Sequence, residues 1–366
     1  MKQNPKNDDD YTYALPEEHR RRHAFCLYVY RNLAQMLKQH NATRAHRIVS
    51  ETLRDIAGGH GQILSEIEVI RFLRDNAFNH EYRHHLLSNL SLALIADMLR
   101  YLHQSLHALA DGNLSVGLTL LRKPIKENLL FLAWILADED GFLGRFAEKN
   151  YESLNGVISK DRAQEIFEKT IPLLVTPDYF DVTQLCEAIY SKQFQDGLEP
   201  LWQRSAHLIT SQGNLLKTQD YSINLIFEDA IGSPYFGIVY QWIPVIFLLA
   251  SQVAPECMRL AFKFNETTHS HHIISTIGYF ETLGYLETDA SVVAQMISHA
   301  FSRFLKCDSC GYKLEILESS GSLLYEHEQL ECSQCGCLTR VPLYWLLKIS
   351  KIRASRNGIQ VEDVTQ

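Results

Sequence analysis

The chain has 366 residues, of which 46% are hydrophobic and 21% are charged, and its formal net charge is -8. This length exceeds a single typical core, so we expect one large domain and one smaller module. The acidic balance excludes a protein that coats nucleic acid with its whole surface, although it is compatible with a local basic patch.

The first 18 residues are mostly polar and charged, with no positively charged start followed by an apolar core as in a secretory signal. We therefore predict a disordered lead-in over residues 1–18 and a cytoplasmic protein.

Between residues 19 and 305 apolar residues recur at steps of three and four, which is typical of amphipathic helices. The clearest run consists of Leu87, Leu90, Leu94, Met98, Leu102, Leu106 and Leu109. Pro124 is expected to kink the apolar run that follows, and Ala254–Pro255 is expected to separate two helices. No alternating strand pattern precedes residue 311, so we predict an all-α multi-helix bundle over residues 19–305.

The most apolar stretch runs from Tyr235 to Ala254. Gln241, Trp242 and Pro244 interrupt it, whereas a membrane span needs roughly 20 predominantly apolar residues. We therefore predict a buried core helix here and no membrane partner.

Four cysteines near the C-terminus form two C-x-x-C pairs, Cys307 with Cys310 and Cys332 with Cys335. Two thiolates two residues apart can bind one side of a tetrahedral Zn²⁺, and a second pair completes the coordination. The alternation of apolar and polar residues over 312–316, with a turn at 318–322, predicts a β-hairpin between the pairs.

The cysteine pairs and this hairpin resemble the zinc-ribbon family. The resemblance implies a small C-terminal β-hairpin zinc ribbon over residues 306–342, with a structural Zn²⁺ that leaves no open position for a substrate. Cys337 is a spare thiol that could replace Cys335. The alternative is a small hairpin with unliganded thiols.

No acidic residue occurs between Cys332 and Val361, and residues 343–366 are expected to form a short basic helix and a tail. Cations and an aromatic residue that suit phosphate contact and base stacking are Arg340, Trp345, Lys348, Lys351, Arg353 and Arg356. They predict a site for nucleic acid, either RNA or DNA. The alternative is a solvated basic helix face with Trp345 packed inward. The zinc ribbon could also serve a protein partner.

His80, Glu81 and His84 form an H-E-x-x-H pattern, the arrangement of two metal ligands and a general base in zinc metalloproteases. The cation of Arg83 inside the motif and the absence of framing strands argue against a protease. The alternative is a polar helix start capped by Asn79.

Two further segments, Arg54 to His60 and Arg74 to His80, match an Arg-x(4–6)-His pattern. They resemble the motif of the HEPN superfamily, whose members are helical, often dimeric and frequently ribonucleases of phage defence. This resemblance implies a metal-independent ribonuclease with Arg54 and His60 as catalytic residues, and a chain able to form a homodimer. Such chemistry needs a histidine for proton transfer and a cation for the phosphate.

The helical part also resembles an uncharacterised all-helical bacterial family with an Arg…Glu helix and a downstream Ser/Thr-His segment. The matching residues here are Arg122, Glu127, Thr268 and His269. The alternative is an ion pair between Lys123 and Glu127. Together these patterns favour a cytoplasmic helical protein whose zinc ribbon is an interaction module, and the resemblances place it in prokaryotic defence or mobile-element biology.

Overall fold

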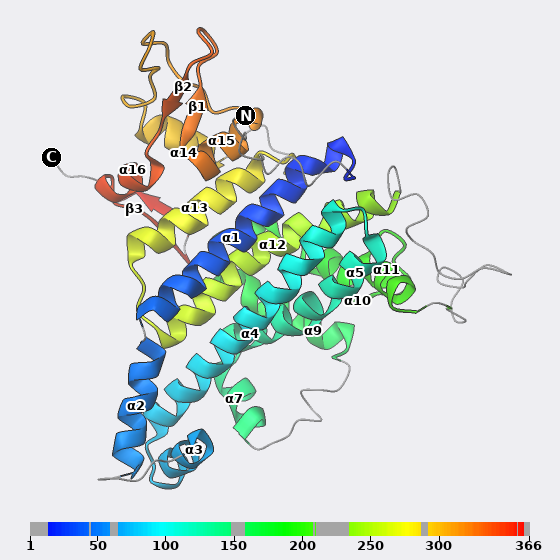
Figure 1. Ribbon diagram of the computed structural model, residues 1–366, viewed down its shortest axis with the longest axis vertical. Coiled ribbons are helices and arrows are strands. Elements are labelled where there is room, and N and C mark those ends of the chain that lie inside the picture. The colour runs from blue at the N-terminus through cyan, green and yellow to red at the C-terminus, as the bar shows by residue number, and fades with distance from the viewer. Residues whose placement is uncertain are drawn as a thin grey trace, which may run out of the picture.

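The computed structural model describes residues 14–43, 45–58, 65–147, 158–207, 209, 234–286, 292–356 and 358–361. Helices dominate it, which confirms the predicted all-α body (Figure 1). The helices before residue 306 are α1 (Glu17–Thr43), α2 (Ala45–Gly58), α3 (Glu66–Asp75), α4 (Asn79–Ala110), α5 (Leu114–Lys123), α6 (Leu130–Ala137), α7 (Glu139–Ala147), α9 (Lys160–Thr170), α10 (Val182–Tyr190), α11 (Leu198–Ala206), α12 (Pro234–Ala261), α13 (Glu266–Glu281) and α14 (Val292–Ala300).

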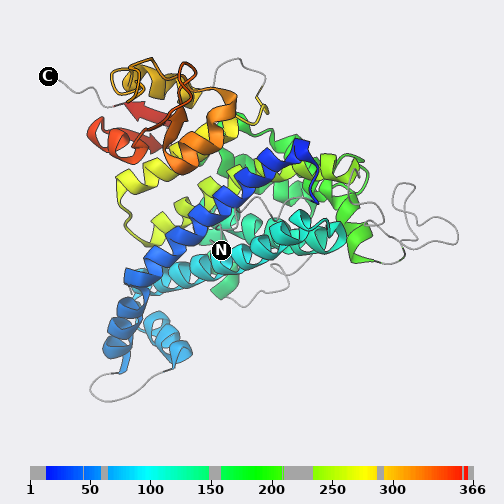
Figure 2. The ribbon, with the colours of Figure 1, turned by 45° about the horizontal axis from the view of Figure 1, so that its top comes forward.

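The long helices α1, α4, α12 and α13 form the centre of the body: α1 packs against both α4 and α12, and α12 packs against α13 (Figures 1 and 2). The leucine stripe predicted for α4 faces this core, with Met98, Leu102, Leu106 and Leu109 buried. Helices α2 and α3 form a separate small apolar cluster at one end of the molecule.

Helix α12 is largely buried, as its apolar sequence predicts. By length and composition it could cross a membrane, and 78% of its most apolar stretch is buried inside the structure. It continues through both Pro244 and Pro255, so the predicted break at Ala254–Pro255 is wrong. Each proline removes one backbone donor, but the helix is packed on its neighbours along its length, and this packing outweighs the local penalty.

The predicted kink at Pro124 takes a specific form. Residues Pro124–Leu129 make a π-helical turn between α5 and α6. A proline has no N–H for the regular α-helical bond, and a π-turn is one way in which a helix accommodates such a defect.

The C-terminal region contains two small antiparallel sheets, which confirms the predicted small β-hairpin module. Neither sheet lies between the cysteine pairs, where the sequence predicted the hairpin. Residues 318–327 form a short 3₁₀ turn and helix α15 (Gly321–His327). The first sheet instead flanks the second cysteine pair, with β1 (Gln329–Glu331) paired to β2 (Leu338–Arg340). Helix α16 (Leu343–Ile349) follows, and then β3 (Ile352–Ser355) pairs with β4 (Gly358–Val361).

Helix α13 is the main support of this C-terminal region. Tyr325 of α15 packs directly against Gly278, where a Cβ atom would lie 2.4 Å from its ring. The Ser270 hydroxyl accepts a hydrogen bond from the amide of Ala354 at 3.1 Å. From α1, a guanidinium nitrogen of Arg21 donates to the carbonyl of Glu318 at 2.7 Å. Body and C-terminal region therefore share one continuous apolar core.

Replacing Gly278 with alanine should separate α15 from α13, because the new methyl group would overlap the buried Tyr325 ring. We expect a loss of about 1–3 kcal/mol in the free energy of unfolding, measured by urea titration. The matched control is Gly237→Ala in α12, where nothing lies near the new methyl group, and which should gain roughly 0.5–1 kcal/mol. Equal effects of the two substitutions would contradict the close packing at Gly278.

Acid should destabilise the body through His23, which is 1% exposed and whose Nδ1 lies 2.7 Å from the Tyr240 hydroxyl. Burial, helped by the charge of His107, lowers the pKa of His23 to about 4. Because the unfolded chain binds this proton at about pH 6.5, the stability is complete above that pH and is lost as the pH falls towards 4. Urea titrations measure the free energy of unfolding that is lost between these pH values. This loss should be about 3 kcal/mol smaller in His23→Gln than in the wild type. The exposed His299→Gln should leave it unchanged.

Candidate metal centre

Two loops of the same local structure carry the four cysteines. In the first loop the amide of Gly311 donates to the carbonyl of Cys307 at 2.9 Å, and in the second the amide of Gly336 donates to that of Cys332 at 2.8 Å. Both glycines have a positive φ, 72° and 69°, a conformation that other residues adopt only with strain. The glycine after each C-x-x-C pair thus allows the chain to turn around its two sulfurs.

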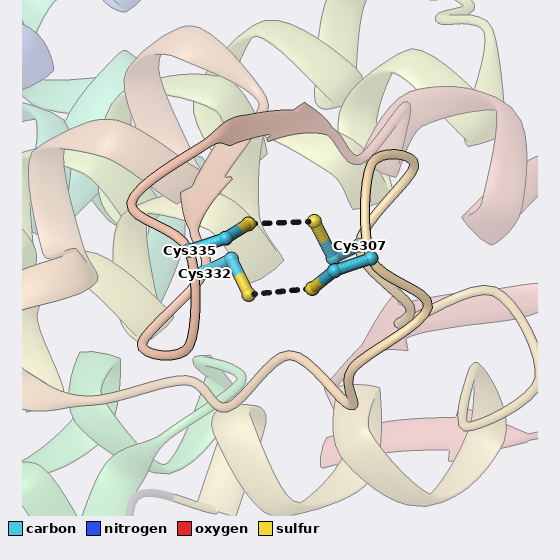
Figure 3. A group of neighbouring side chains, drawn as sticks. Cys307, Cys332 and Cys335 are labelled. Atoms are coloured by element: carbon cyan, nitrogen blue, oxygen red, sulfur yellow. Dashed lines mark hydrogen bonds between the residues drawn. The ribbon is translucent and has the colours of Figure 1, made fainter.

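The two loops face each other and bring all four sulfurs within 4.8 Å of one another (Figure 3). Across the gap the Sγ atoms of Cys307 and Cys335 are 3.6 Å apart, and those of Cys310 and Cys332 are 3.7 Å apart. A tetrahedral ion with metal–sulfur bonds of about 2.3 Å requires sulfur–sulfur separations of roughly 3.8 Å. The observed separations fit this value, and they are far longer than the roughly 2.05 Å of a disulfide bond.

The surroundings of the sulfurs favour thiolate at one position and oppose it at another. Backbone amides, first that of Cys310 and then that of Ser309, lower the pKa of Cys307 to about 6. At Cys335 the amide of Cys337 also lowers the pKa, but the nearby sulfurs of Cys310 and Cys307 outweigh it and raise the pKa overall. Four sulfurs so close together cannot all ionise without a cation between them, and a divalent ion would supply that charge.

Among the described residues, these four cysteines are the only group of three or more histidine, cysteine or acidic side chains whose ligand atoms converge closely enough for a metal ion. Cys337 is exposed and lies outside the group. The geometry therefore gives Cys335, and not Cys337, the fourth ligand position. The site lies at the surface, since Cys310 and Cys335 are exposed while Cys307 and Cys332 are buried.

The residues predicted to contact nucleic acid do not form a single group. Trp345 and Lys348 are exposed on α16, and Arg340 is exposed on β2. Arg356 instead lies 3.8 Å from the carboxylate of Glu256 on α12.

The other two predicted contacts follow α16. Lys351 has a positive φ of 50° at the turn before β3, and Arg353 is half-buried on β3. The cations of the tail are thus divided between the outer side of α16 and the junction with the body.

The H-E-x-x-H residues lie in the first turns of α4, where the ring centroids of His80 and His84 are 6.5 Å apart. Glu81 is half-buried, and no third ligand joins the two histidines within the described chain. Arg83 forms an ion pair with Glu139 at 2.7 Å. The helix has no side-chain cap, and Phe78, not Asn79, occupies the N-cap position.

Of the HEPN-like pair, Arg54 is half-buried on α2, whereas His60 lies outside the described residues. The structure therefore does not place the two side chains relative to each other. In the second copy of the pattern, Arg74 at the end of α3 forms an ion pair with its neighbour Asp75 at 2.9 Å. The ribonuclease assignment stays a prediction.

The four residues matched to the uncharacterised bacterial family lie on different helices. Arg122 and Glu127 are exposed at the junction of α5 and α6, while Thr268 and His269 line a cavity at the start of α13. Neither Arg122 nor Glu127 lines that cavity. Lys123 pairs with Asp97 at 2.8 Å.

Comparisons with known proteins add no relative: the chain matches no family model, no curated protein and no solved structure.

The sequence analysis did not identify two residues that take part in these contacts, Phe304 and Glu256. Phe304, directly before the first cysteine loop, is exposed and its ring contacts Trp345. Glu256 of α12 is buried beside His269 of α13. The apolar phenylalanine next to a cysteine loop is a weak signal, and nothing in the sequence links Glu256 to His269.

The cluster predicts one divalent ion per chain, with Cys335 as a ligand and Cys337 as a bystander. Cys335→Ser should lose the ion and lower the free energy of unfolding of the C-terminal region by several kcal/mol, because metal binding and folding are coupled. Cys337→Ser, two residues away, should retain the ion. Metal content by mass spectrometry after gel filtration checks both. Retention in Cys335→Ser with loss in Cys337→Ser would show that Cys337 is the fourth ligand.

Proposed function

We propose that the four cysteines hold a structural Zn²⁺ and that the module they stabilise contacts nucleic acid through the outer face of α16. The observation that carries the proposal is the exposure of Trp345, which is 50% accessible and meets Phe304, itself 54% accessible. Exposed apolar residues that adjoin one another on a surface often mark an interaction site.

Zinc is the ion that suits this ligand set best. Four thiolates in a tetrahedral arrangement favour Zn²⁺ or an iron–sulfur site over Mg²⁺ and Ca²⁺, which prefer oxygen ligands. The paired C-x-x-C spacing is typical of structural zinc. With four protein ligands the ion has no position for substrate, so its role is to hold the two loops together.

The outer face of α16 combines rings with a cation. Trp345, Lys348 and Ile349 are three and four positions apart and therefore lie on one side of the helix. Tyr344, also exposed, lies one turn before Lys348. The two rings offer flat surfaces on which bases stack, and the ammonium group offers a partner for phosphate.

One carboxylate at the start of α16 is already engaged. Glu328 accepts a hydrogen bond from the amide of Tyr344 at 2.9 Å and lies 3.6 Å from the His271 ring. The nearby His271 ring outweighs burial and lowers the pKa of Glu328, with further help from the charge of Arg340. Arg340, whose charge acts on Glu328, adds a further cation near the start of α16.

A protein partner is the second candidate, and it has its own observation. Leu338 on β2 and Ile349 on α16 are exposed apolar residues of the same module. Protein interfaces are enriched in aromatic and apolar side chains at their centre. A protein partner would use these residues and would depend less on Lys348 than nucleic acid would.

Fluorescence anisotropy with labelled single-stranded RNA and DNA tests the proposal. Trp345→Ala should weaken binding by about 1–3 kcal/mol, roughly five- to hundredfold, through loss of base stacking. Lys348→Glu should weaken binding further and reduce its dependence on salt. Lys169→Glu, an exposed charge reversal on α9, should have little effect.

Unchanged affinity in both Trp345→Ala and Lys348→Glu would contradict the nucleic-acid proposal. If neither RNA nor DNA binds the zinc-loaded wild type at low salt, the module serves a protein partner instead. Far-ultraviolet circular dichroism of each variant confirms that the fold is retained.

A further inference from the structure

A cavity of about 280 Å³ lies where the end of α12, the start of α13 and the second half of α1 meet. It is separate from the metal centre, since none of the four cysteines lines it. Its apolar walls are formed by Met36, Pro255, Phe262 and Phe264. Its polar lining consists of Gln39, His40, Lys263, Asn265, Thr268, His269 and His272.

The lining contains one cationic residue, Lys263, together with three histidines, and no acidic residue. The N-terminus of α13, a helix of 16 residues, opens at the cavity, with Asn265 as N-cap accepting the amide of Thr268 at 3.1 Å. The positive end of the helix dipole adds to the positive potential of Lys263.

His269 is a buried part of the cavity wall and not a surface residue. It is 5% exposed, and its Nε2 lies 3.3 Å from the carboxylate of Glu256. Arg259 also contacts that carboxylate, at 3.0 Å, and Arg356 approaches it from the C-terminal region at 3.8 Å. The carboxylate is therefore surrounded by cations and by His269, and these contacts fix the orientation of the imidazole ring.

Two further observations agree with this arrangement. Burial raises the pKa of Glu256, but hydrogen bonds and charges from His269 and Arg259 outweigh it, so that its pKa is lowered and the group is ionised near neutrality. Burial, followed by the charges of His271 and His269, lowers the pKa of His272 to about 4. His272 is therefore a neutral hydrogen-bonding group at pH 7.

We infer that this cavity binds a small organic carboxylate with an apolar body, the carboxylate meeting Lys263 and Thr268 beside the N-terminus of α13 and the body lying against Phe262 and Phe264. Ligand sites combine apolar walls with a few polar groups that orient one end of the ligand, as here. A cavity of about 150 Å³ holds benzene, so the larger volume here accommodates a ring with a short acidic side chain.

Three probes with one body and different head groups test this inference on the full, metal-loaded chain: 3-phenylpropionate, its neutral amide, and 3-phenylpropylamine. Isothermal titration calorimetry should give a dissociation constant in the millimolar range for the carboxylate, as expected for a ligand of this size. The amide should bind at least about fivefold more weakly, corresponding to the loss of roughly 1 kcal/mol. The amine should show no binding.

Lys263→Gln and Thr268→Val should each weaken binding of the carboxylate while leaving that of the amide nearly unchanged. Both positions are at least partly exposed, so these variants should fold even if His269→Gln does not. Lys38→Gln, an exposed charge removal on α1 that does not line the cavity, is the matched control.

Equal binding of carboxylate and amine, or no binding of any probe at millimolar concentration, would overturn the inference. An equal loss in Lys38→Gln and Lys263→Gln would overturn it as well, because the effect would then reflect overall charge. The outcome is independent of the nucleic-acid test, which uses α16 and neither Lys263 nor Thr268.

Discussion

The two cysteine loops contain no helix, and the β1–β2 sheet beside them has strands of only three residues, so the arrangement of these loops depends on the convergence of four sulfurs. The Sγ separations of 3.6 and 3.7 Å between the two loops are those that a tetrahedral ion requires. Each loop is shaped for this purpose by a glycine with positive φ. The metal would cross-link the two loops, and β1 and β2 extend from the second of them.

Helix α13 connects this region to the rest of the chain. Its Gly278 admits the ring of Tyr325, its Ser270 binds the backbone of β3, and its His271 approaches Glu328 beneath α16. At its N-terminus the same helix carries His269 into the wall of a cavity. The metal-binding region is thus joined to the body by a shared core and polar contacts, and Arg356 reaches the carboxylate behind that cavity wall.

Local patterns made the helical body and the metal ligands predictable. The stripe along α4 follows from helical periodicity, and the four cysteines follow from two C-x-x-C pairs, a spacing typical of tetrahedral metal sites. The hairpin predicted between the cysteine pairs failed because the fold of this segment depends on a distant contact: α15 forms where Tyr325 can pack against Gly278. In the same way, α12 continues through Pro255 because its neighbours support it, and no local signal reports that support.

The candidate sites also differ in how far the sequence could predict them. Trp345 and Lys348 could be found from the basic, aromatic composition of the tail, but their common helix face with Ile349 depends on where α16 begins. The pairing of Glu256 with His269 joins two helices and has no signature in either segment. The Arg54 and His60 pair shows the opposite case, a pattern visible in sequence whose second member lies outside the described structure.

X-ray absorption at the zinc edge of the purified full-length protein tests the central claim most directly. The account predicts one tightly held ion per chain with a first shell of four sulfur atoms at about 2.3 Å. A stoichiometric ion with oxygen or nitrogen in its first shell, or protein prepared without chelators that contains no metal, would contradict it.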